Sequence, residues 1–204
     1  MKGSNLIARG RRTKVERRER GQQLYEEYAY VLDYLPYGKP GSRPGYRMGA
    51  IVQLIGETYF TLLEASVKSG VTLKTYDRVY VGKSLRKEIT YILGRIGYDE
   101  LTTNAKMELA NVIERIVQNR EGWFVNFFNT AQAVTPRMHA LELIPGIGKK
   151  YMWQIVDERE KKPFENFEEL QRRVNIPNPV KLISKRILEE LMGKSKYRLF
   201  TRPS

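Results

Sequence analysis

The stretch of sequence that decides the fold is PRMHALELIPGIGKKYMWQIV, residues 136–156, with PGIGKK at 145–150 as its centre. Thr135 and the proline after it are typical of a helix start, and apolar residues then recur at helical spacing. We therefore predict a short helix that begins there and ends at Pro145. Apolar spacing resumes after the second glycine, which predicts another helix from Lys149 onward. A tight glycine-containing turn is predicted to join the two helices.

This turn has the composition of an anion-binding site. Unpaired amides at the turn and at the helix start point outward together, and glycine lets a ligand approach closely. Lysines in a first helical turn oppose the macrodipole unless an anion is bound there. The isoleucine between the glycines is expected to point into the core. The residues predicted to bind phosphate are Gly146, Ile147, Gly148, Lys149 and Lys150.

The same stretch resembles a helix-hairpin-helix motif, an element that binds nucleic acid without sequence specificity. Its pattern is an apolar residue, often proline, then glycine, an apolar residue, glycine and a basic helix start. Leu141, Ile144 and residues 145–149 match that pattern, and Ile155 closes the apolar face. The resemblance implies contact with a phosphate backbone. The alternative is a glycine-rich turn in an all-helical core whose two lysines are simply solvated.

The pattern returns 32 residues further along the chain. IPGIGKKYMWQI at 144–155 aligns with IPNPVKLISKRI at 176–187. A second hairpin is predicted, and the pair resembles a tandem unit in which two such motifs bury each other's apolar faces. Asn178 and Val180 stand where the first copy has glycines. Because valine is stiff and blocks close approach, we expect the second copy to be a structural partner.

Positive charge is concentrated at the two ends of the chain. The 204 residues carry a net charge of +13, yet residues 1–21 alone hold eight Lys or Arg against two Glu, and residues 193–204 hold four basic and no acidic residues. Two basic arms on a nearly neutral body are typical of proteins that bind RNA or DNA, although solubilising tails are the alternative. The N-terminal arm is expected to be flexible. Its predicted nucleic-acid contacts are Arg9, Arg11, Arg12, Lys14, Arg17 and Arg18.

Several kinds of chemical site are disfavoured by the residues present. Cysteine is absent, which excludes thiolate metal sites and cysteine nucleophiles. VGKS at 81–84 lacks the glycine that a nucleotide-hydrolysing loop requires five residues before Gly82. His139 is the chain's one histidine, and a surface or capping role is expected for it. We predict no cofactor, no metal site and no catalytic residue, with a nuclease site built from distant carboxylates as the alternative.

The hydropathy of the chain predicts a cytoplasmic protein without membrane contact. The basic N-terminal segment lacks the apolar run of a signal peptide, and no stretch reaches the length of about 18 apolar residues that a spanning helix needs. Neither basic arm has an apolar face with aromatic anchors, so binding to a membrane surface is also disfavoured.

Five short β-rich segments are predicted before the helices, with a Gly/Pro loop at 38–49 after the first. They span 28–35, 50–56, 58–65, 71–74 and 77–82. Their number and loop pattern resemble an OB-type barrel, small and closed. That resemblance implies binding of single-stranded nucleic acid through stacking and backbone charge. The residues available for it are Tyr28, Tyr30, Tyr34, Tyr59 and Phe60 as platforms, with Lys39, Arg43 and Arg47 as phosphate partners.

Helical spacing is predicted from Ser84 onward. Leu85, Ile89, Ile92, Leu93 and Ile96 fit one amphipathic helix, and an apolar stripe from Leu101 to Val117 predicts a second, capped by Asp99 or Thr102. The aromatic residues that follow are assigned to the core that joins these helices to the hairpin, with a protein-partner surface as the alternative. They are Trp123, Phe124, Phe127 and Phe128.

The predicted fold class is α+β, with an N-terminal OB-like β-barrel and an all-α region that contains tandem helix-hairpin-helix motifs. The predicted divisions are a basic arm (1–21), the barrel (22–83), connecting helices (84–134), the tandem hairpin domain (135–192) and a basic tail (193–204).

Over nearly its whole length, this order of segments, including WFVNFFN and LELIPGIGKK, resembles an archaeal family of uncharacterised proteins predicted to bind RNA or nucleotides. The resemblance implies nucleic-acid binding with no assigned reaction. We predict a non-catalytic nucleic-acid-binding protein, with RNA favoured over DNA. A DNA-repair or RNA-processing nuclease, and an assembly factor that binds a protein of the translation or repair machinery, are the alternatives.

Overall fold

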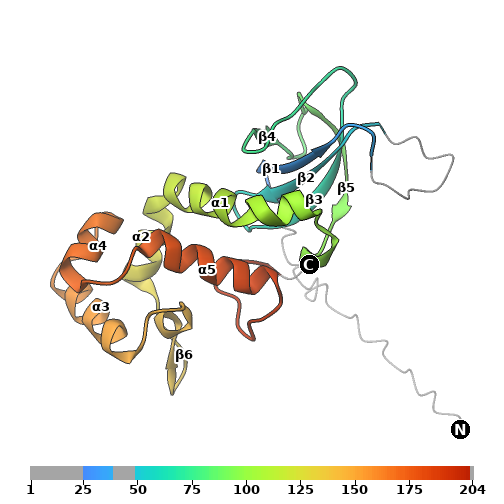
Figure 1. Ribbon diagram of the computed structural model, residues 1–204. Coiled ribbons are helices and arrows are strands. Elements are labelled where there is room, and N and C mark those ends of the chain that lie inside the picture. Colours follow the sequence, from blue (N-terminus) through green and yellow to red (C-terminus); the bar gives the residue numbers. More distant parts are fainter. Residues whose placement is uncertain (1–24, 39–48, 203–204) are drawn as a thin grey trace, which may run out of the picture.

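The computed structural model describes residues 25–38 and 49–202, and this part of the chain has an α+β fold (Figure 1). Its strands are β1 (Tyr28–Leu35), β2 (Ile51–Gly56), β3 (Leu62–Val67), β4 (Arg78–Tyr80), β5 (Ile89–Arg95), β6 (Ala133–Thr135) and β7 (Met138–His139). Its α-helices are α1 (Thr103–Asn119), α2 (Glu121–Thr130), α3 (Lys149–Lys161), α4 (Phe167–Val174) and α5 (Pro179–Leu191). Two 3₁₀ turns are η1 (Tyr98–Glu100) and η2 (Ala140–Leu143).

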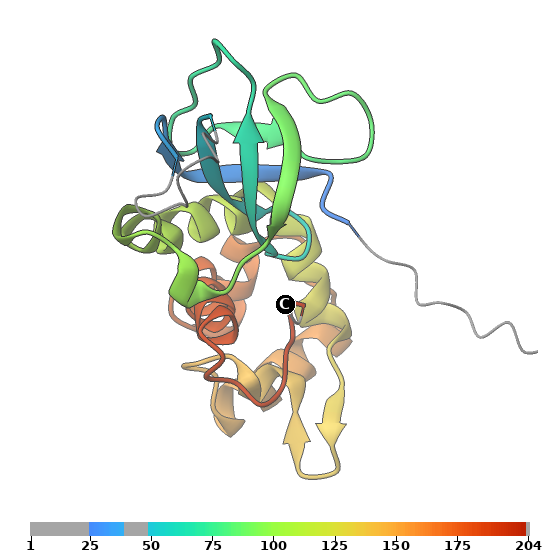
Figure 2. The ribbon, with the colours of Figure 1, turned by 90° about the vertical axis from the view of Figure 1, so that its right-hand side faces the viewer.

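Strands β1 to β5 form one antiparallel sheet in the order β4-β1-β2-β3-β5. The sheet curls strongly, as Figure 2 shows, but β4 and β5 are its two edges and do not pair with each other among the described residues. The sheet is therefore a half-barrel, and the prediction of a closed barrel was wrong in this respect.

The two-faced character predicted for residues 28–35 is confirmed by β1. Tyr30 and Leu32 are buried in the core that the sheet shares with the helices. Ala29 and Val31 are buried in a second core, which lies on the other face of the sheet. Because successive strand residues point to opposite faces, one strand contributes to both cores.

The sheet continues further along the chain than predicted. Residues 71–74 are not a strand, and the fifth strand is β5, in a segment for which a helix was predicted. The apolar residues there do fit a helical period, but Leu85 is 92% exposed while Ile89 is buried beside β3. The β-branched and aromatic residues of this segment suit a strand, and register shifts in its pairing with β3 disturb a simple alternation.

Helix α1 confirms the predicted apolar stripe and its cap. Thr102 is the N-cap, and its hydroxyl oxygen accepts a hydrogen bond from the Ala105 N–H at 3.0 Å. The same hydroxyl donates to the carboxylate of Asp33 in β1 at 2.6 Å. The helix lies between the sheet and α5 in Figure 1, so one hydrophobic core runs from the sheet through α1 into the helical region.

The helix predicted from Thr135 to Pro145 does not form. Residues on either side of Pro136 and Arg137 pair as the hairpin β6–β7, in which Thr135 lies opposite Met138. Proline suits the first central position of such a turn. His139 then caps η2, because its Nδ1 accepts a hydrogen bond from the Leu141 N–H at 3.1 Å. The capping role expected for His139 is confirmed, and the element that it caps is a 3₁₀ turn.

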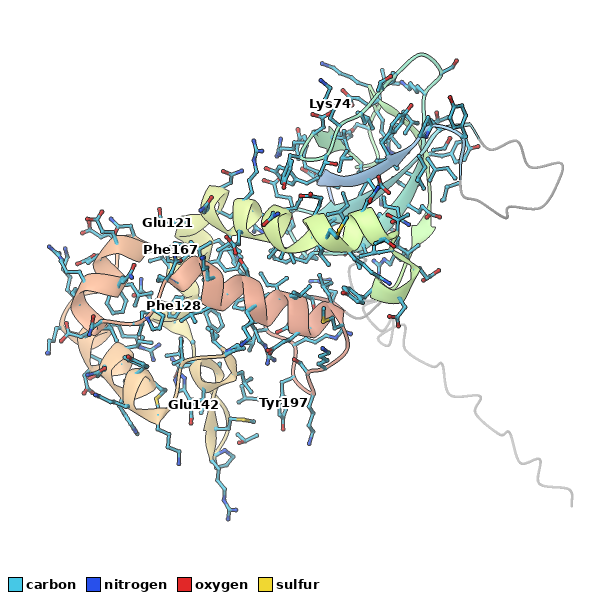
Figure 3. All side chains as sticks on the ribbon, viewed as in Figure 1. Lys74, Glu121, Phe128, Glu142, Phe167 and Tyr197 are labelled. Atoms are coloured by element: carbon cyan, nitrogen blue, oxygen red, sulfur yellow. The ribbon has the colours of Figure 1, made fainter. Side chains whose placement is uncertain are left out.

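The aromatic cluster belongs mainly to the core. Phe124 and Phe128 are fully buried, and Phe128 is labelled among the helices in Figure 3. Phe200, from the segment after α5, packs against the rings of Phe124 and Phe127 at 5.5 and 5.0 Å between centroids. Of the four aromatic residues assigned to this cluster, only Trp123 is exposed, at 44%.

Candidate nucleic-acid interface

The turn between η2 and α3 places its central isoleucine as predicted. Ile147 is 3% exposed and packs in the main core, whereas Gly146 and Gly148 on either side are exposed. Gly146 has a φ of +95°, a conformation that glycine adopts without strain. A Cβ on Gly146 would also lie 3.0 Å from the side chain of Leu182 in α5, so this glycine allows the turn to pack closely on that helix.

Gly148 has a different role. Its φ of −85° is open to any residue, and a Cβ there would meet nothing within 4 Å. It is the N-cap of α3, where its lack of a side chain leaves no capping acceptor for the helix start. The absence of a side chain at this position therefore keeps the helix start accessible from solvent.

Backbone donors converge at this helix start. The first amides of a helix have no intrahelical partner, and within the described part of the chain the amides of Lys149 and Lys150 donate to no side-chain acceptor. The amides of Gly146 and Gly148 are likewise without a hydrogen-bond acceptor there. The Ile147 N–H is different, since it donates to the Ile144 carbonyl at 3.0 Å. Four of the five predicted residues thus offer a free amide, and Ile147 contributes packing.

The second repeat is built differently at the corresponding place. Helix α4 ends at Asn175 in a left-handed conformation, with φ of 56°, and α5 begins at Pro179. Asn178 caps α5, because its side-chain oxygen accepts a hydrogen bond from the Lys181 N–H at 3.3 Å. By the sequence alignment α5 would begin at Lys181, so its start lies two residues earlier than that of α3. In the second copy, the side chain of Asn178 therefore satisfies a backbone N–H at the helix start.

A groove of about 660 Å³ lies between the hairpin β6–β7 and α3. Its walls include Arg137 from the hairpin and Lys149 and Trp153 from α3, so it opens beside the turn described above. Glu142, labelled in Figure 3, accepts a hydrogen bond from the His139 N–H at 2.9 Å and also lines the groove. Trp153 was not predicted to be a site residue, because a single tryptophan at helical spacing does not reveal its exposure.

Arg159 lines this groove and ties α3 to the end of α2. Its guanidinium donates to the carbonyls of Phe128 and Ala131, both at 2.9 Å. Burial lowers the pKa of Arg159, and burial followed by the nearby Arg159 charge lowers the pKa of His139. The lowered pKa favours the neutral form of His139, which its capping hydrogen bond requires.

The tyrosines predicted as base platforms on the sheet are largely engaged within the protein. Tyr30 is 4% exposed and its hydroxyl accepts from Asn119 at 3.1 Å. The Tyr34 hydroxyl donates to the Val71 carbonyl at 3.2 Å. Phe60, the fifth predicted platform, is fully buried. These three residues serve packing, which sequence alternation alone does not distinguish from an exposed aromatic face.

The other two tyrosines each have an arginine on the ring. The guanidinium of Arg78 lies 3.6 Å from the ring centroid of Tyr28, and that of Arg202 lies 4.0 Å from the ring centroid of Tyr59. One face of each ring is therefore already covered. The predicted loop cations Lys39, Arg43 and Arg47, and the arm residues Arg9, Arg11, Arg12, Lys14, Arg17 and Arg18, lie outside the described residues.

The segment after α5 is packed against the protein as far as Arg202. The carboxylate of Glu190 accepts hydrogen bonds from the backbone N–H groups of Leu199, Phe200 and Thr201 at 2.8 to 3.1 Å. Arg186 pairs with Glu190 at 2.8 Å and also donates to the Tyr197 carbonyl. For the described part of 193–204, this docked segment replaces the free basic arm that the charge pattern suggested.

A smaller hollow of about 280 Å³ opens at the edge of the half-barrel. Its lining combines the apolar residues Leu63, Val81 and Ile92 with the cations Lys83, Arg86 and Arg95. Arg86 donates to the carbonyls of Val81 and Gly82 and so holds the turn after β4. No site was predicted at these cations, because the VGKS stretch at 81–84 lacks the glycine of a nucleotide-hydrolysing loop.

Glu158, an acidic residue of α3, forms ion pairs within α3 and with α4. Glu158 pairs with Lys161 at 2.6 Å and with Arg173 of α4 at 3.1 Å. Its pKa is lowered by these two hydrogen bonds, with Lys161 the larger cause.

Within residues 25–38 and 49–202, no group of three or more His, Asp or Glu side chains is arranged to hold a metal ion. No helix of the described residues is both long and apolar enough to cross a membrane.

Comparison with known proteins identifies the family. A family model described as "Protein of unknown function (DUF655)" matches residues 25–202. The chain belongs to this family. One DUF655 relative is the uncharacterized protein MJ0038 of Methanocaldococcus jannaschii, which is 46% identical over 182 residues, covering 88% of this chain and 82% of that protein.

A solved structure from the DUF655 family supports the architecture. The crystal structure of Af1531 from Archaeoglobus fulgidus superimposes with a TM-score of 0.80 at 48% sequence identity. The match covers 87% of this chain and 100% of the Archaeoglobus chain. Both relatives are archaeal, which agrees with the archaeal family that the sequence resembles.

Proposed function

We propose that this protein binds nucleic acid without catalysing a reaction on it, and that RNA is preferred to DNA. The turn 145–150 with η2 and α3 is interpreted as a helix-hairpin-helix element that holds one phosphate group of the backbone. The half-barrel is interpreted as an OB-type sheet. The preference for RNA rests on that likeness and on the resemblance to a family predicted to bind RNA.

One observation carries the proposal. Helices α1, α4 and α5 each begin at a residue whose side chain accepts a backbone hydrogen bond, namely Thr102, Asn166 and Asn178. Helix α3 begins at an exposed glycine with no such acceptor, and two lysines occupy its first turn. Free donors, a helix dipole and cations at one point favour an anion there.

The charges around the turn support a phosphate ligand. Lys149 and Lys150 are exposed, and neither has a salt-bridge partner among the described residues. By contrast, the lysines at the far end of α3 pair with glutamates: Lys161 with Glu158 and Lys162 with Glu165. The net charge of +13 for the whole chain favours a polyanion over a small isolated anion.

Two substitutions at Gly148 test this proposal. Gly148→Val adds a side chain into open space at a permitted φ, so the fold is retained while close approach of a phosphate is blocked. Gly148→Asp adds a carboxylate that caps the helix itself, which stabilises the fold by about 0.3 kcal/mol and repels phosphate. We expect each variant to bind a labelled RNA about 10- to 100-fold more weakly by fluorescence anisotropy.

Asn178→Ala is the matched control, because it removes the cap of the second copy. It should lower the unfolding free energy by about 1 kcal/mol and leave RNA affinity unchanged. If both Gly148 variants bind as tightly as the parent, the amides of this turn do not hold phosphate.

The ligand class is tested with matched single- and double-stranded RNA and DNA at two salt concentrations. A phosphate-directed mode predicts that log affinity falls linearly with log salt concentration. Cleavage of either nucleic acid in the presence of Mg²⁺ or Mn²⁺ would contradict the non-catalytic part of the proposal. Binding that persists at high salt would instead indicate apolar contacts, for which Trp123, the exposed member of the aromatic cluster, is a candidate.

A further inference from the structure

The groove between the hairpin β6–β7 and α3 has a property that phosphate binding does not use. Trp153 lines this groove and is 59% exposed, although tryptophan is usually highly buried. Its indole N–H has no hydrogen-bond partner among the residues that the structure describes. A large aromatic surface is thus left open to solvent in a concave site.

Trp153 is placed close to the turn by helix geometry. It follows Lys149 by four residues, so both side chains lie on one face of α3, about 6 Å apart along the axis. Side chains on a helix lean towards its N-terminus. The indole therefore lines the groove and leans towards the free amides at the helix start.

The groove has charged groups of both signs. Arg137, Lys149 and Arg159 supply positive charge, and Glu142 and Glu160 supply carboxylates. The cations suit a phosphodiester, and the carboxylates suit the amino groups on the edge of a base. Met138 and Met152 add adaptable apolar surface to the lining. An apolar peptide would use the methionines and the indole but would leave the charges of Arg137 and Lys149 without partners.

We propose that this groove holds one unpaired nucleotide, with its base stacked on Trp153 and its phosphate at the start of α3. This inference rests on the proposed nucleic-acid binding and adds a substrate class to it. In a duplex, both faces of each base are covered by neighbouring bases, so a blunt duplex engages only the phosphate part of the site. Single strands, bulges and unpaired ends engage both parts.

The two tryptophans of the chain make a direct test available. In Trp123→Phe, Trp153 is the sole tryptophan, and its emission reports on the groove. Binding of a single-stranded RNA of ten nucleotides is followed by indole fluorescence and, in parallel, by anisotropy of a label on the RNA. We expect quenching that saturates together with the anisotropy change. A blunt RNA duplex should raise the anisotropy without that quenching.

Affinity measurements separate stacking from a structural role. Trp153→Ala should weaken single-strand binding about 5- to 150-fold and change duplex binding less than about twofold. Trp153→Phe should restore much of the single-strand affinity, because it keeps an aromatic face, whereas Trp153→Leu should not. Met107→Ala is the matched control for loss of an exposed apolar side chain, since Met107 is 63% exposed on α1.

The outcomes distinguish this inference from the function on which it rests. RNA that binds by anisotropy without quenching Trp153, and that binds Trp153→Ala equally well, would overturn the stacking site and leave nucleic-acid binding intact. Absence of binding to any RNA or DNA would overturn the proposed function itself.

Discussion

The carboxylate of Glu190 accepts hydrogen bonds from both the backbone N–H and the hydroxyl of Thr201, at 2.9 and 3.0 Å. Glu190 is 1% exposed, and eleven residues separate it from Thr201 along the chain. This pairing anchors the segment after α5, places Phe200 in the aromatic cluster and brings Arg202 over the ring of Tyr59. The C-terminal segment thereby joins the helices to the sheet.

Removal of this anchor is expected to be costly. Glu190→Ala leaves the guanidinium of Arg186 buried without its partner and the amides of residues 199–201 without an acceptor. Loss of one member of such a buried pair costs about 3–5 kcal/mol. We expect a fall of that size in the unfolding free energy from urea titration, and faster tryptic cleavage after Arg198.

Glu189→Ala, next to it and half-buried, is the control and should change stability by less than about 0.5 kcal/mol. Equal stability of Glu190→Ala and the parent chain would show that the segment is held by its apolar contacts alone.

Substitution of Gly146 is expected to lower the stability of the fold, whereas substitution of Gly148 is expected to weaken RNA binding. Gly146→Ala forces a side chain into a φ of +95° and against Leu182, which should cost about 1–2 kcal/mol in unfolding free energy. Gly148→Ala meets open space at an ordinary φ, so its stability should stay within about 0.5 kcal/mol of the parent.

The measurements are thermal or urea unfolding for stability and anisotropy for RNA affinity. Gly148→Ala should weaken binding less than Gly148→Val, because the methyl group is smaller. A large loss of stability in Gly148→Ala would contradict the assignment of this glycine to ligand approach.

His139 is expected to make stability depend on pH near neutrality. Burial, followed by the charge of Arg159, lowers the pKa of this histidine in the folded chain. As the pH falls, the unfolded chain takes up the proton first, so the stabilising contribution is complete above the ordinary pKa of about 6.5. It declines as the pH falls towards the folded pKa and is lost below it. Protonation also removes the Nδ1 acceptor that caps η2.

Urea unfolding at pH 7.5, 6.5 and 5.5 measures this effect. The parent chain should lose stability over this range, while His139→Asn should not, because asparagine supplies a capping oxygen that does not titrate. Since the chain has one histidine, an NMR titration of its imidazole gives the folded pKa directly. A midpoint at or above the ordinary value would refute the predicted direction.

The sequence by itself determined the elements whose apolar residues follow the period of a helix or a strand. The stripe of α1, the alternation in β1, the start of α3 at Lys149 and the inward-facing Ile147 all follow from residues close together in the chain. Local spacing is sufficient in these cases, because side chains that share a helical stripe or a strand face are buried together.

Tertiary structure decided the features that depend on distant partners. Residues 89–95 form a strand because they pair with the edge of β3. Tyr30 is a core residue because it packs with α1 and its hydroxyl accepts a hydrogen bond from Asn119. The basic C-terminal segment was held down by a buried carboxylate, although its charge suggested a free arm. The exposure of Trp153 likewise depends on the groove beside the hairpin. Hydrogen-bond partners and packing surfaces far away in sequence leave no local period, so only the folded chain reveals them.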